Sequence, residues 1–427
     1  MSADSEGMQV PATKDTAQAG PAPAARVSLT VIVREWTRIG VTGFGGPPAH
    51  IALLRRLCVQ RNQWLSEEEF EDGIAATSLL PGPASTQLAI FCAWRLAGVA
   101  GALLGGACFI VPGLIIILAL SALFLEHSPP AWVTGAAAGA GAAVPAVAVA
   151  AAVGLLPASW RRAGAATRSR ARWIVYLVAG GVAANLAGQF LVVVLLGCGL
   201  AEWLVRRNVA AAIQDSADPG GSASGGDRGP ASGSHSSGRG PAALLLPLAA
   251  RAVTAGAVGS LAWVAIKVGL LSFGGGFVII PLMQHDAVHT YHWMTTAQFL
   301  SAVALGQVTP GPVVLTTSVV GYAAAGLVGG VLAALIAFAP SFIMVLAGGP
   351  HFERFRRSVA AQSFLAGAGP AAIGAIAGAA VTLGLGLTHF WQVIVLAAAV
   401  GWLLVLRRGV VVAILGAAAV GVIIALA

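Results

Sequence analysis

The chain has 427 residues, of which only 9% are charged and 57% are hydrophobic. A soluble domain carries about 25% charged residues, so this composition excludes an ordinary soluble domain. The formal net charge is +8, but most arginines lie in short segments between apolar runs. That distribution is typical of the cytoplasmic loops of membrane proteins rather than of a nucleic-acid-binding surface.

The first segment, residues 1–27, is rich in Ala, Pro, Gly and Thr and has no apolar core. It does not look like a signal peptide and predicts a disordered N-terminal tail. Long apolar runs follow, among them residues 99–124, 327–346, 393–406 and 410–427. Runs of about 20 residues can cross a bilayer as helices, and unbroken runs exclude the alternating pattern of a β-barrel. The sequence therefore predicts an all-α integral membrane protein.

Two halves of similar length flank a polar segment. Residues 215–240 read DSADPGGSASGGDRGPASGSHSSGRG, a composition that buries too little apolar surface to fold and is typical of a flexible linker. We predict a first repeat over 28–207, a flexible cytoplasmic linker over 208–247 and a second repeat over 248–427.

The two halves match when the sequence is shifted so that Gly40 falls on Gly269. Several other positions then agree in order: Phe44, Gly45, Gly46, Trp64 and Phe70 fall on Phe273, Gly274, Gly275, Trp293 and Phe299, and Pro81-Gly82-Pro83 falls on Pro310-Gly311-Pro312. With one residue dropped, Pro112 falls on Pro340 and Gly139 on Gly367. An ordered set of matches indicates a tandem duplication.

Each half is interrupted twice, first at an FGG motif and then at a PGP motif. Residues 70–80 and 84–96 are too short to span the bilayer alone. They predict a re-entrant hairpin that turns at PGP, which is tolerable only against protein or a water-filled cavity. A first helix that ends at FGG, together with four long apolar helices after the hairpin, predicts about five crossings in each half.

Basic residues indicate the orientation of the two halves. The segment 160–172 carries five arginines and its counterpart 386–389 carries none, whereas 351–357 carries three and its counterpart 126–130 carries none. Since short basic loops favour the cytoplasm, we predict inverted repeats with the linker inside and both termini outside. Inverted repeats are typical of transporters.

The FGG and PGP breaks form the candidate substrate site. A broken helix exposes N–H groups at its new N-terminus, which bind anions, and glycine lets a ligand approach the backbone closely. The break residues predicted to bind substrate are Gly45, Gly46, Gly274, Gly275, Pro81, Gly82, Pro83, Pro310, Gly311 and Pro312. The alternative is that they only kink helices for packing.

Four polar side chains complete the predicted site. Arg38 and Lys267 hold equivalent positions before FGG, and a charge at the centre of a membrane helix costs about 2.5–3.5 kcal/mol, which favours a functional role. The alternative is that they snorkel to an interface. Gln87 and Thr316 lie one turn after PGP and can hydrogen-bond a substrate, although polar packing residues look the same. No P-loop, catalytic triad or His/Cys metal centre occurs, so neither an enzyme nor a cofactor is predicted.

The motifs GFGGP and SFGGG, each followed by PGP and then by a helix with GAG, resemble the chromate ion transporter family over about residues 28–427. The two-repeat arrangement is similar to that of the long-chain members. The resemblance implies export of chromate from a bacterial cytoplasm through the inner membrane, coupled to the proton gradient. Chromate resistance follows from such export, with sulfate as a competing ion.

Alternatives follow from the chemistry of the substrate. Chromate and sulfate are both tetrahedral dianions, so a cage of donors treats them similarly, and a transporter of sulfate or another oxyanion is the second hypothesis. An anion channel would need a continuous pore, and a membrane scaffold would leave the paired breaks unexplained. The oligomeric state is open, with a homodimer as one option.

Overall fold

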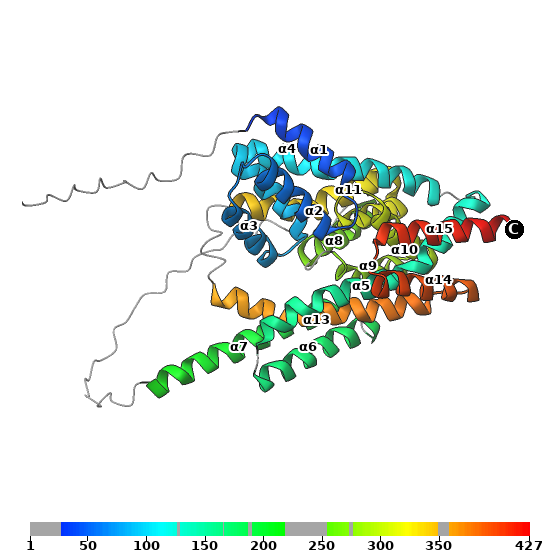
Figure 1. Ribbon diagram of the computed structural model, residues 1–427. Helices are drawn as coiled ribbons and strands as arrows, with labels where there is room; N and C mark the ends of the chain where they lie inside the picture. Colours follow the sequence, from blue (N-terminus) through cyan, green and yellow to red (C-terminus); the bar gives the residue numbers. More distant parts are fainter. Residues whose placement is uncertain are drawn as a thin grey trace, which may run out of the picture.

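The computed structural model describes residues 27–125, 129–164, 166–186, 190–217, 254–272, 276–348 and 358–427. The predicted tail (all but Val27), most of the predicted linker, and Gly274 and Gly275 lie outside these residues. Across the described ranges the regular structure is helical, with no strand (Figure 1).

The described residues of the first half form seven α-helices. They are α1 (Leu29–Thr42), α2 (Pro47–Arg55), which continues as a π-helical turn (Arg56–Arg61), α3 (Glu67–Leu79), α4 (Ala84–Phe124), α5 (Ala131–Ala163), α6 (Thr167–Leu186) and α7 (Leu191–Ala217). The last of these extends ten residues past the predicted end of the first repeat at residue 207, so the boundary of the linker predicted from composition falls inside a helix.

The second half repeats this order. It comprises α8 (Thr254–Leu271), α9 (Ile279–Gln284), a π-helical turn (His285–Thr290), α10 (Thr296–Val308), a 3-10 turn (Val313–Leu315), α11 (Thr316–Gly348), α13 (Val359–Leu385), α14 (Phe390–Val400), a π-helical turn (Gly401–Val405) and α15 (Val410–Leu426). Four described helices, namely α4, α5, α11 with its preceding turn, and α13, are long and apolar enough to cross a membrane. The prediction of an all-α membrane protein is confirmed.

The backbone repeats in detail between the halves. Helices α3 and α10 are both 13 residues long and begin at equivalent positions, Glu67 and Thr296. Helix α4 is broken at Ala97 and Gly98, where Gly98 has φ 61 and ψ −151, and α11 is broken in the same way at Gly326, with φ 62 and ψ −153. This left-handed backbone favours glycine. The residue that must be dropped to align the halves therefore falls at the break.

The first FGG motif turns the chain back on itself. The N–H of Val27 donates to the carbonyl of Leu96 (3.3 Å) at the start of α1. After the turn at Gly45 and Gly46, α2 and its π-helical turn return along α1, and Arg61 pairs with Glu35 in the middle of that helix (4.0 Å). At 14 residues α1 is about 21 Å long, which is less than the roughly 30 Å of a hydrocarbon core.

Helix α1 is thus one arm of a helical hairpin that turns at the first FGG motif. The second hairpin, α3 with the first segment of α4, turns at PGP and closes on the same end through a pair between Arg95 and Glu69. Among the described helices of the first half, α4 and α5 are long and apolar enough to cross a membrane. The expected count of about five crossings in each half stays a prediction.

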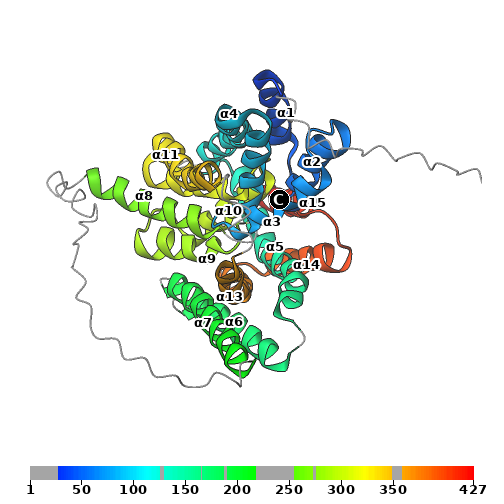
Figure 2. The same cartoon turned by 90° about the vertical axis from the view of Figure 1, so that its left-hand side faces the viewer.

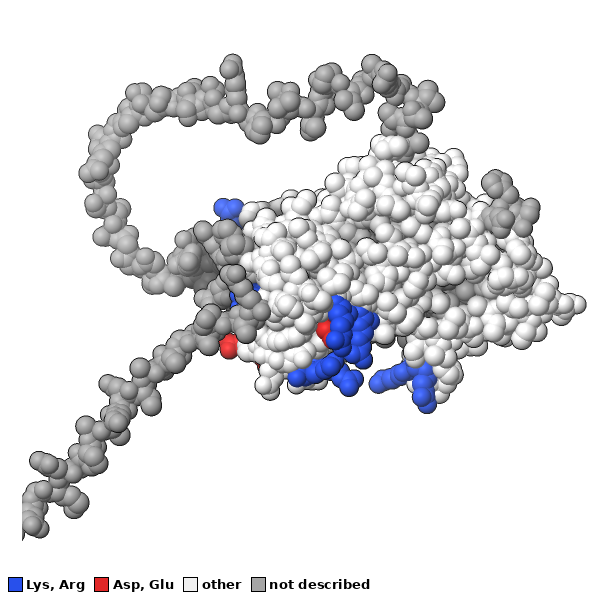
Figure 3. All heavy atoms as spheres, turned by 90° about the horizontal axis from the view of Figure 1, so that it is seen from above, with Lys and Arg blue, Asp and Glu red and all other residues white. Residues whose placement is uncertain are grey.

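Ion pairs hold the two hairpins together at their open ends. Arg55 of α2 pairs with both Glu67 and Glu71 of α3. Part of the acidic run at the start of α3 thus forms ion pairs with arginines of the hairpins. Glu69 also completes a capping box with Ser66. On the face seen in Figure 3, the basic and acidic side chains gather toward the left and middle, and the right-hand part carries none.

The halves interleave through glycine contacts. Helices α4 and α11 cross antiparallel, since Gly106 faces Phe342 and Leu118 faces Gly330. Helix α5 packs against α14 and α15, while α13 packs against α6 and α7 (Figure 2). Small residues allow such close approach between membrane helices.

One of these contacts gives a test of packing. A Cβ at Gly374 of α13 would lie 1.8 Å from the carbonyl oxygen of Leu177 in α6, whereas a Cβ at Gly384 of the same helix meets nothing within 4 Å. We expect Gly374→Ala to destabilise the protein by about 1–3 kcal/mol through overpacking and Gly384→Ala to leave stability unchanged. Thermal unfolding of the purified variants measures the difference, and equal melting temperatures would contradict this contact.

Candidate functional site

The glycine and proline breaks of the two halves meet in the interior of the protein. The N–H of Gly311, in the second PGP motif, donates to the carbonyl of Gly43 beside the first FGG motif (3.0 Å). A Cβ at Gly82, in the first PGP motif, would lie 3.0 Å from the carbonyl oxygen of Gly269 in α8 and 3.3 Å from Oγ of Ser341 in α11. Each PGP break thus packs on the opposite half.

Backbone conformation explains why these positions are glycine. Gly45, Gly46, Gly82 and Gly311 have φ of 99, 74, 114 and 98, a region that only glycine enters at little cost. Gly276, which follows the undescribed Gly274 and Gly275, has φ 87.

The prolines set where the next helices begin. Pro47 is the first residue of α2, and Pro83 is the N-cap of α4 without a side-chain hydrogen bond. The 3-10 turn after Pro312 likewise lacks a side-chain cap. The first N–H groups of a helix have no partner within it, so α4 directs uncapped donors into the break.

Five polar side-chain atoms around the PGP breaks are buried and have no hydrogen-bond partner among the described residues. The atoms concerned are Oγ1 of Thr86, Oε1 of Gln87, Nε2 of Gln307, Oγ of Ser318 and Oγ of Ser341. Leaving one buried polar atom unpaired costs about 1–3 kcal/mol, and native proteins rarely do so without water or a ligand. Five such atoms around two neighbouring breaks indicate a binding site for a polar ligand.

The predicted hydrogen-bonding residues differ in what they have free. Gln87 is fully buried and donates from Nε2 to the carbonyl of Pro81 (2.6 Å), which leaves its Oε1 unpaired. The hydroxyl of Thr316 donates to the carbonyl of Val313 (2.8 Å) within its own turn. Gln87 therefore has a free acceptor, whereas the hydroxyl hydrogen of Thr316 is already engaged.

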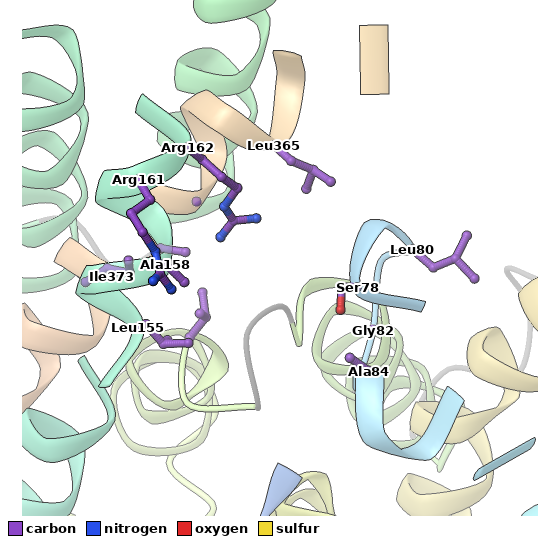
Figure 4. A pocket seen from close by; sticks show the side chains of 13 residues that line it. Ser78, Leu80, Gly82, Ala84, Leu155, Ala158, Arg161, Arg162, Leu365 and Ile373 are labelled. Atoms are coloured by element: carbon purple, nitrogen blue, oxygen red, sulfur yellow. The ribbon is translucent and has the colours of Figure 1, made fainter. Parts of the chain in front are cut away.

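A cavity of about 610 Å³ reaches the first PGP break, a size common for small-molecule sites. Gly82 and Ala84 line one wall, and Arg161 and Arg162 at the end of α5 extend into it from the other (Figure 4). Neither arginine forms an ion pair with a described residue, whereas Arg172 is bound to Glu202. The cavity thus places two uncompensated positive charges opposite the N-terminus of α4.

From the sequence, Arg161 and Arg162 contribute only to the predicted orientation of the chain. Their positions in the sequence do not distinguish them from the other arginines of 160–172. In the structure they differ because α5 lies close to α3, α4 and α13. This is a tertiary contact that spacing does not encode.

The charged pair predicted from the repeat has two different environments. Arg38 is exposed on α1, whereas Lys267 is largely buried, pairs with Asp286 (2.5 Å) and lies 5.4 Å from the ring centroid of Trp263. The first-half counterpart of Asp286 is Leu57. The ammonium of Lys267 is therefore already neutralised, and a role of either cation in substrate binding stays a prediction.

We expect Lys267→Gln to reduce the amount of folded protein, because removing one partner of a buried pair costs about 3–5 kcal/mol. The double variant with Asp286→Asn should recover most of the loss, since no charge is then left unpaired. Size-exclusion profiles of the solubilised variants test this. A single variant as stable as wild type would show that the pair contributes little.

The fold and the cavity define a multi-pass α-helical membrane protein of the transporter type. The chain belongs to the chromate transporter family, whose model matches residues 30–203 and 259–422. It is 30% identical over 385 residues to the chromate transport protein of Cupriavidus metallidurans (88% of each chain). It is 29% identical over 364 residues to a probable chromate transport protein of Synechococcus elongatus (84% of this chain, 85% of the relative).

A chromate transport protein of Pseudomonas aeruginosa is 29% identical over 393 residues, covering 87% of this chain and 84% of the relative. No solved structure matches. The resemblance seen in the motifs is confirmed, and the two matched ranges leave out residues 204–258, which contain the polar segment.

Proposed function

We propose that this protein transports chromate out of a bacterial cytoplasm across the inner membrane, in a manner coupled to the proton gradient, and so confers chromate resistance. The cavity that joins Arg161 and Arg162 to Gly82 and Ala84 carries the proposal. It combines positive charge with a helix N-terminus, the two features that bind an oxyanion. Family membership supports chromate as the ion.

The charge distribution supports a cytoplasmic opening for this cavity. One end of the molecule holds α3, the end of α7 and the start of α13 (left in Figure 1). This end carries the arginines of the α5–α6 turn and of the first-half hairpins. At the other end, Pro129, Gly386 and Ala425 share a pocket, and no described residue lining it is Lys or Arg. By the positive-inside rule the arginine-rich end is cytoplasmic.

We also propose that the halves are inverted repeats. The antiparallel crossing of α4 and α11 supports this, as does the position of α10, which begins in the pocket of the non-basic end while its counterpart α3 begins at the basic end.

A pair of equivalent positions tests the inversion directly. Glu68 of α3 and Ala297 of α10 are both exposed and occupy the same place in the repeat. In a variant lacking the four native cysteines, we expect Glu68→Cys to react with an impermeant maleimide only after permeabilisation and Ala297→Cys to react in intact cells. Labelling of both from one side would refute the inverted repeat.

The arrangement suggests how a dianion crosses. Arginines at the cytoplasmic mouth attract it, the uncapped N-terminus of α4 receives it, and the unpaired hydroxyls of Thr86 and Ser341 donate hydrogen bonds that replace part of its hydration. Because the second PGP break packs beside the first FGG turn, movement of one half against the other would open the site to either side, as in other inverted-repeat transporters.

Chromate uptake into inverted membrane vesicles tests the proposal. We expect uptake when respiration energises the vesicles, loss of uptake when a protonophore collapses the gradient, and weaker inhibition by sulfate than by unlabelled chromate. Stronger inhibition by sulfate would favour a sulfate transporter. Uptake that is indifferent to the gradient would favour a channel, and vesicles that take up no chromate would refute the proposal.

A further inference from the structure

A single histidine lies between the two breaks of the first half. His50, in the first turn of α2, is fully buried, and its counterpart in the second half is Ile279. Its ring stands edge-on to Phe109 of α4, with centroids 5.0 Å apart. Nothing in its sequence surroundings singles it out.

Both ring nitrogens of His50 are engaged. Nε2 lies 2.9 Å from the carbonyl oxygen of Gly43, and Nδ1 lies 3.2 Å from Oγ of Ser85, the second residue of α4. A carbonyl only accepts hydrogen bonds, so Nε2 carries the hydrogen and neutral Nδ1 accepts from the Ser85 hydroxyl. The Gly43 carbonyl also accepts from the N–H of Gly311 (3.0 Å). His50 thus links the first PGP break to the second.

A proton on Nδ1 changes the role of Ser85. Protonated Nδ1 can only donate, so the hydroxyl oxygen of Ser85 must accept and its hydrogen is released toward another acceptor. Ser85 lies between Ala84, which lines the arginine cavity, and Thr86, whose Oγ1 is unpaired. The released hydrogen joins the uncapped N–H groups at the start of α4 as one more donor.

Charge reinforces this exchange of roles. A buried imidazolium is costly unless an anion lies nearby, and a dianion at the start of α4 supplies one. The other charged groups on α1, α2 and α4 are accounted for elsewhere: Glu35 lies near Arg34 and Arg61, Arg55 pairs with Glu67 and Glu71, Arg95 pairs with Glu69, and Arg38 is exposed.

We infer that His50 is a proton-linked positioning residue: a proton taken from water at its Nδ1 turns Ser85 into a donor for an oxyanion bound at the start of α4. Proton and anion then bind cooperatively, and each raises the affinity for the other by the same factor. Because the second half has Ile279 and Val314 in place of His50 and Ser85, only one of the two related breaks carries the device. The inference rests on the proposed anion site.

Chromate exchange in proteoliposomes, with the same pH on both sides, tests the inference. Between about pH 8 and about pH 5, a range that reaches below the ordinary titration of histidine because a buried imidazolium is costly, we expect wild-type affinity for chromate to rise at least ~fivefold relative to that of His50→Gln. Chromate itself takes up a proton in this range, but wild type and variant meet the same mixture, so their ratio isolates the protein. His289→Gln, at an exposed histidine, should behave like wild type.

Ser85→Ala provides the second variant. It keeps the histidine and its charge but removes the hydroxyl that passes the proton's effect to the anion, so the pH dependence of its affinity should fall between those of wild type and His50→Gln. Wild-type pH dependence in either variant would overturn the inference, and if His50→Gln does not fold, Ser85→Ala decides. Wild-type protein that exchanges no chromate would instead refute the proposed function.

Discussion

Replacing Gly82 by alanine is expected to reduce chromate uptake at least tenfold. Gly82 has φ 114, and an added Cβ would lie 2.8 Å from Nε2 of Gln87, 3.0 Å from the carbonyl oxygen of Gly269 and 3.3 Å from Oγ of Ser341. The left-handed backbone alone costs about 1–3 kcal/mol for a residue with a side chain. The methyl group would also displace Gln87 and occupy the wall of the cavity nearest to α4.

The control separates backbone strain from the loss of the site. Gly164 also has positive φ, 80, but a Cβ there meets nothing within 4 Å, and it follows α5 outside the breaks. We expect Gly164→Ala to retain near-normal uptake per folded molecule. Initial rates of uptake, normalised to the protein in the vesicles, provide the comparison, and a Gly82→Ala variant with wild-type rates would remove the first PGP break from the transport path.

The repeat and the breaks could be predicted from the sequence because they depend on local backbone chemistry. A left-handed turn requires glycine, and a helix can begin but not continue at proline. A PGP motif therefore predicts a turn followed by a new helix in both halves. The N-termini of α3 and α10 can be predicted as well, since Ser66 and Thr295 each form a capping box with the residue three positions on.

What the sequence could not provide depends on contacts between distant segments. Residues 29–42 look like the start of a crossing, and only the approach of Arg61 to Glu35 reveals that the chain turns back. Lys267 appeared to be free because its partner Asp286 has no acidic counterpart in the first half. The sequence does not single out His50, because its hydrogen-bond partner Ser85 is 35 residues away.

The second large effect is expected at Arg162. This residue and Arg161 are the cations that line the cavity at the first PGP break, and in Figure 4 the guanidinium of Arg162 extends into the space between α5 and the Gly82 turn. A dianion needs compensating charge there, since a helix N-terminus supplies only about half a unit. We expect Arg162→Gln to raise the KM for chromate about tenfold or more, and the double variant with Arg161→Gln to raise it further, because each removes positive charge from one wall.

Arg162→Lys should fall between Arg162→Gln and wild type, because lysine keeps the charge but loses the planar fork that binds two oxyanion oxygens. Arg168→Gln is the matched control, since Arg168 is exposed and does not line the cavity. Uptake rates over a range of chromate concentrations separate KM from the maximal rate. If the charge acts only by attracting the anion through solution, Arg168→Gln would weaken uptake as much as Arg162→Gln, and high salt would erase both effects. A selective, salt-resistant loss at Arg162 would instead place the anion in direct contact with its guanidinium on the way to the first PGP break.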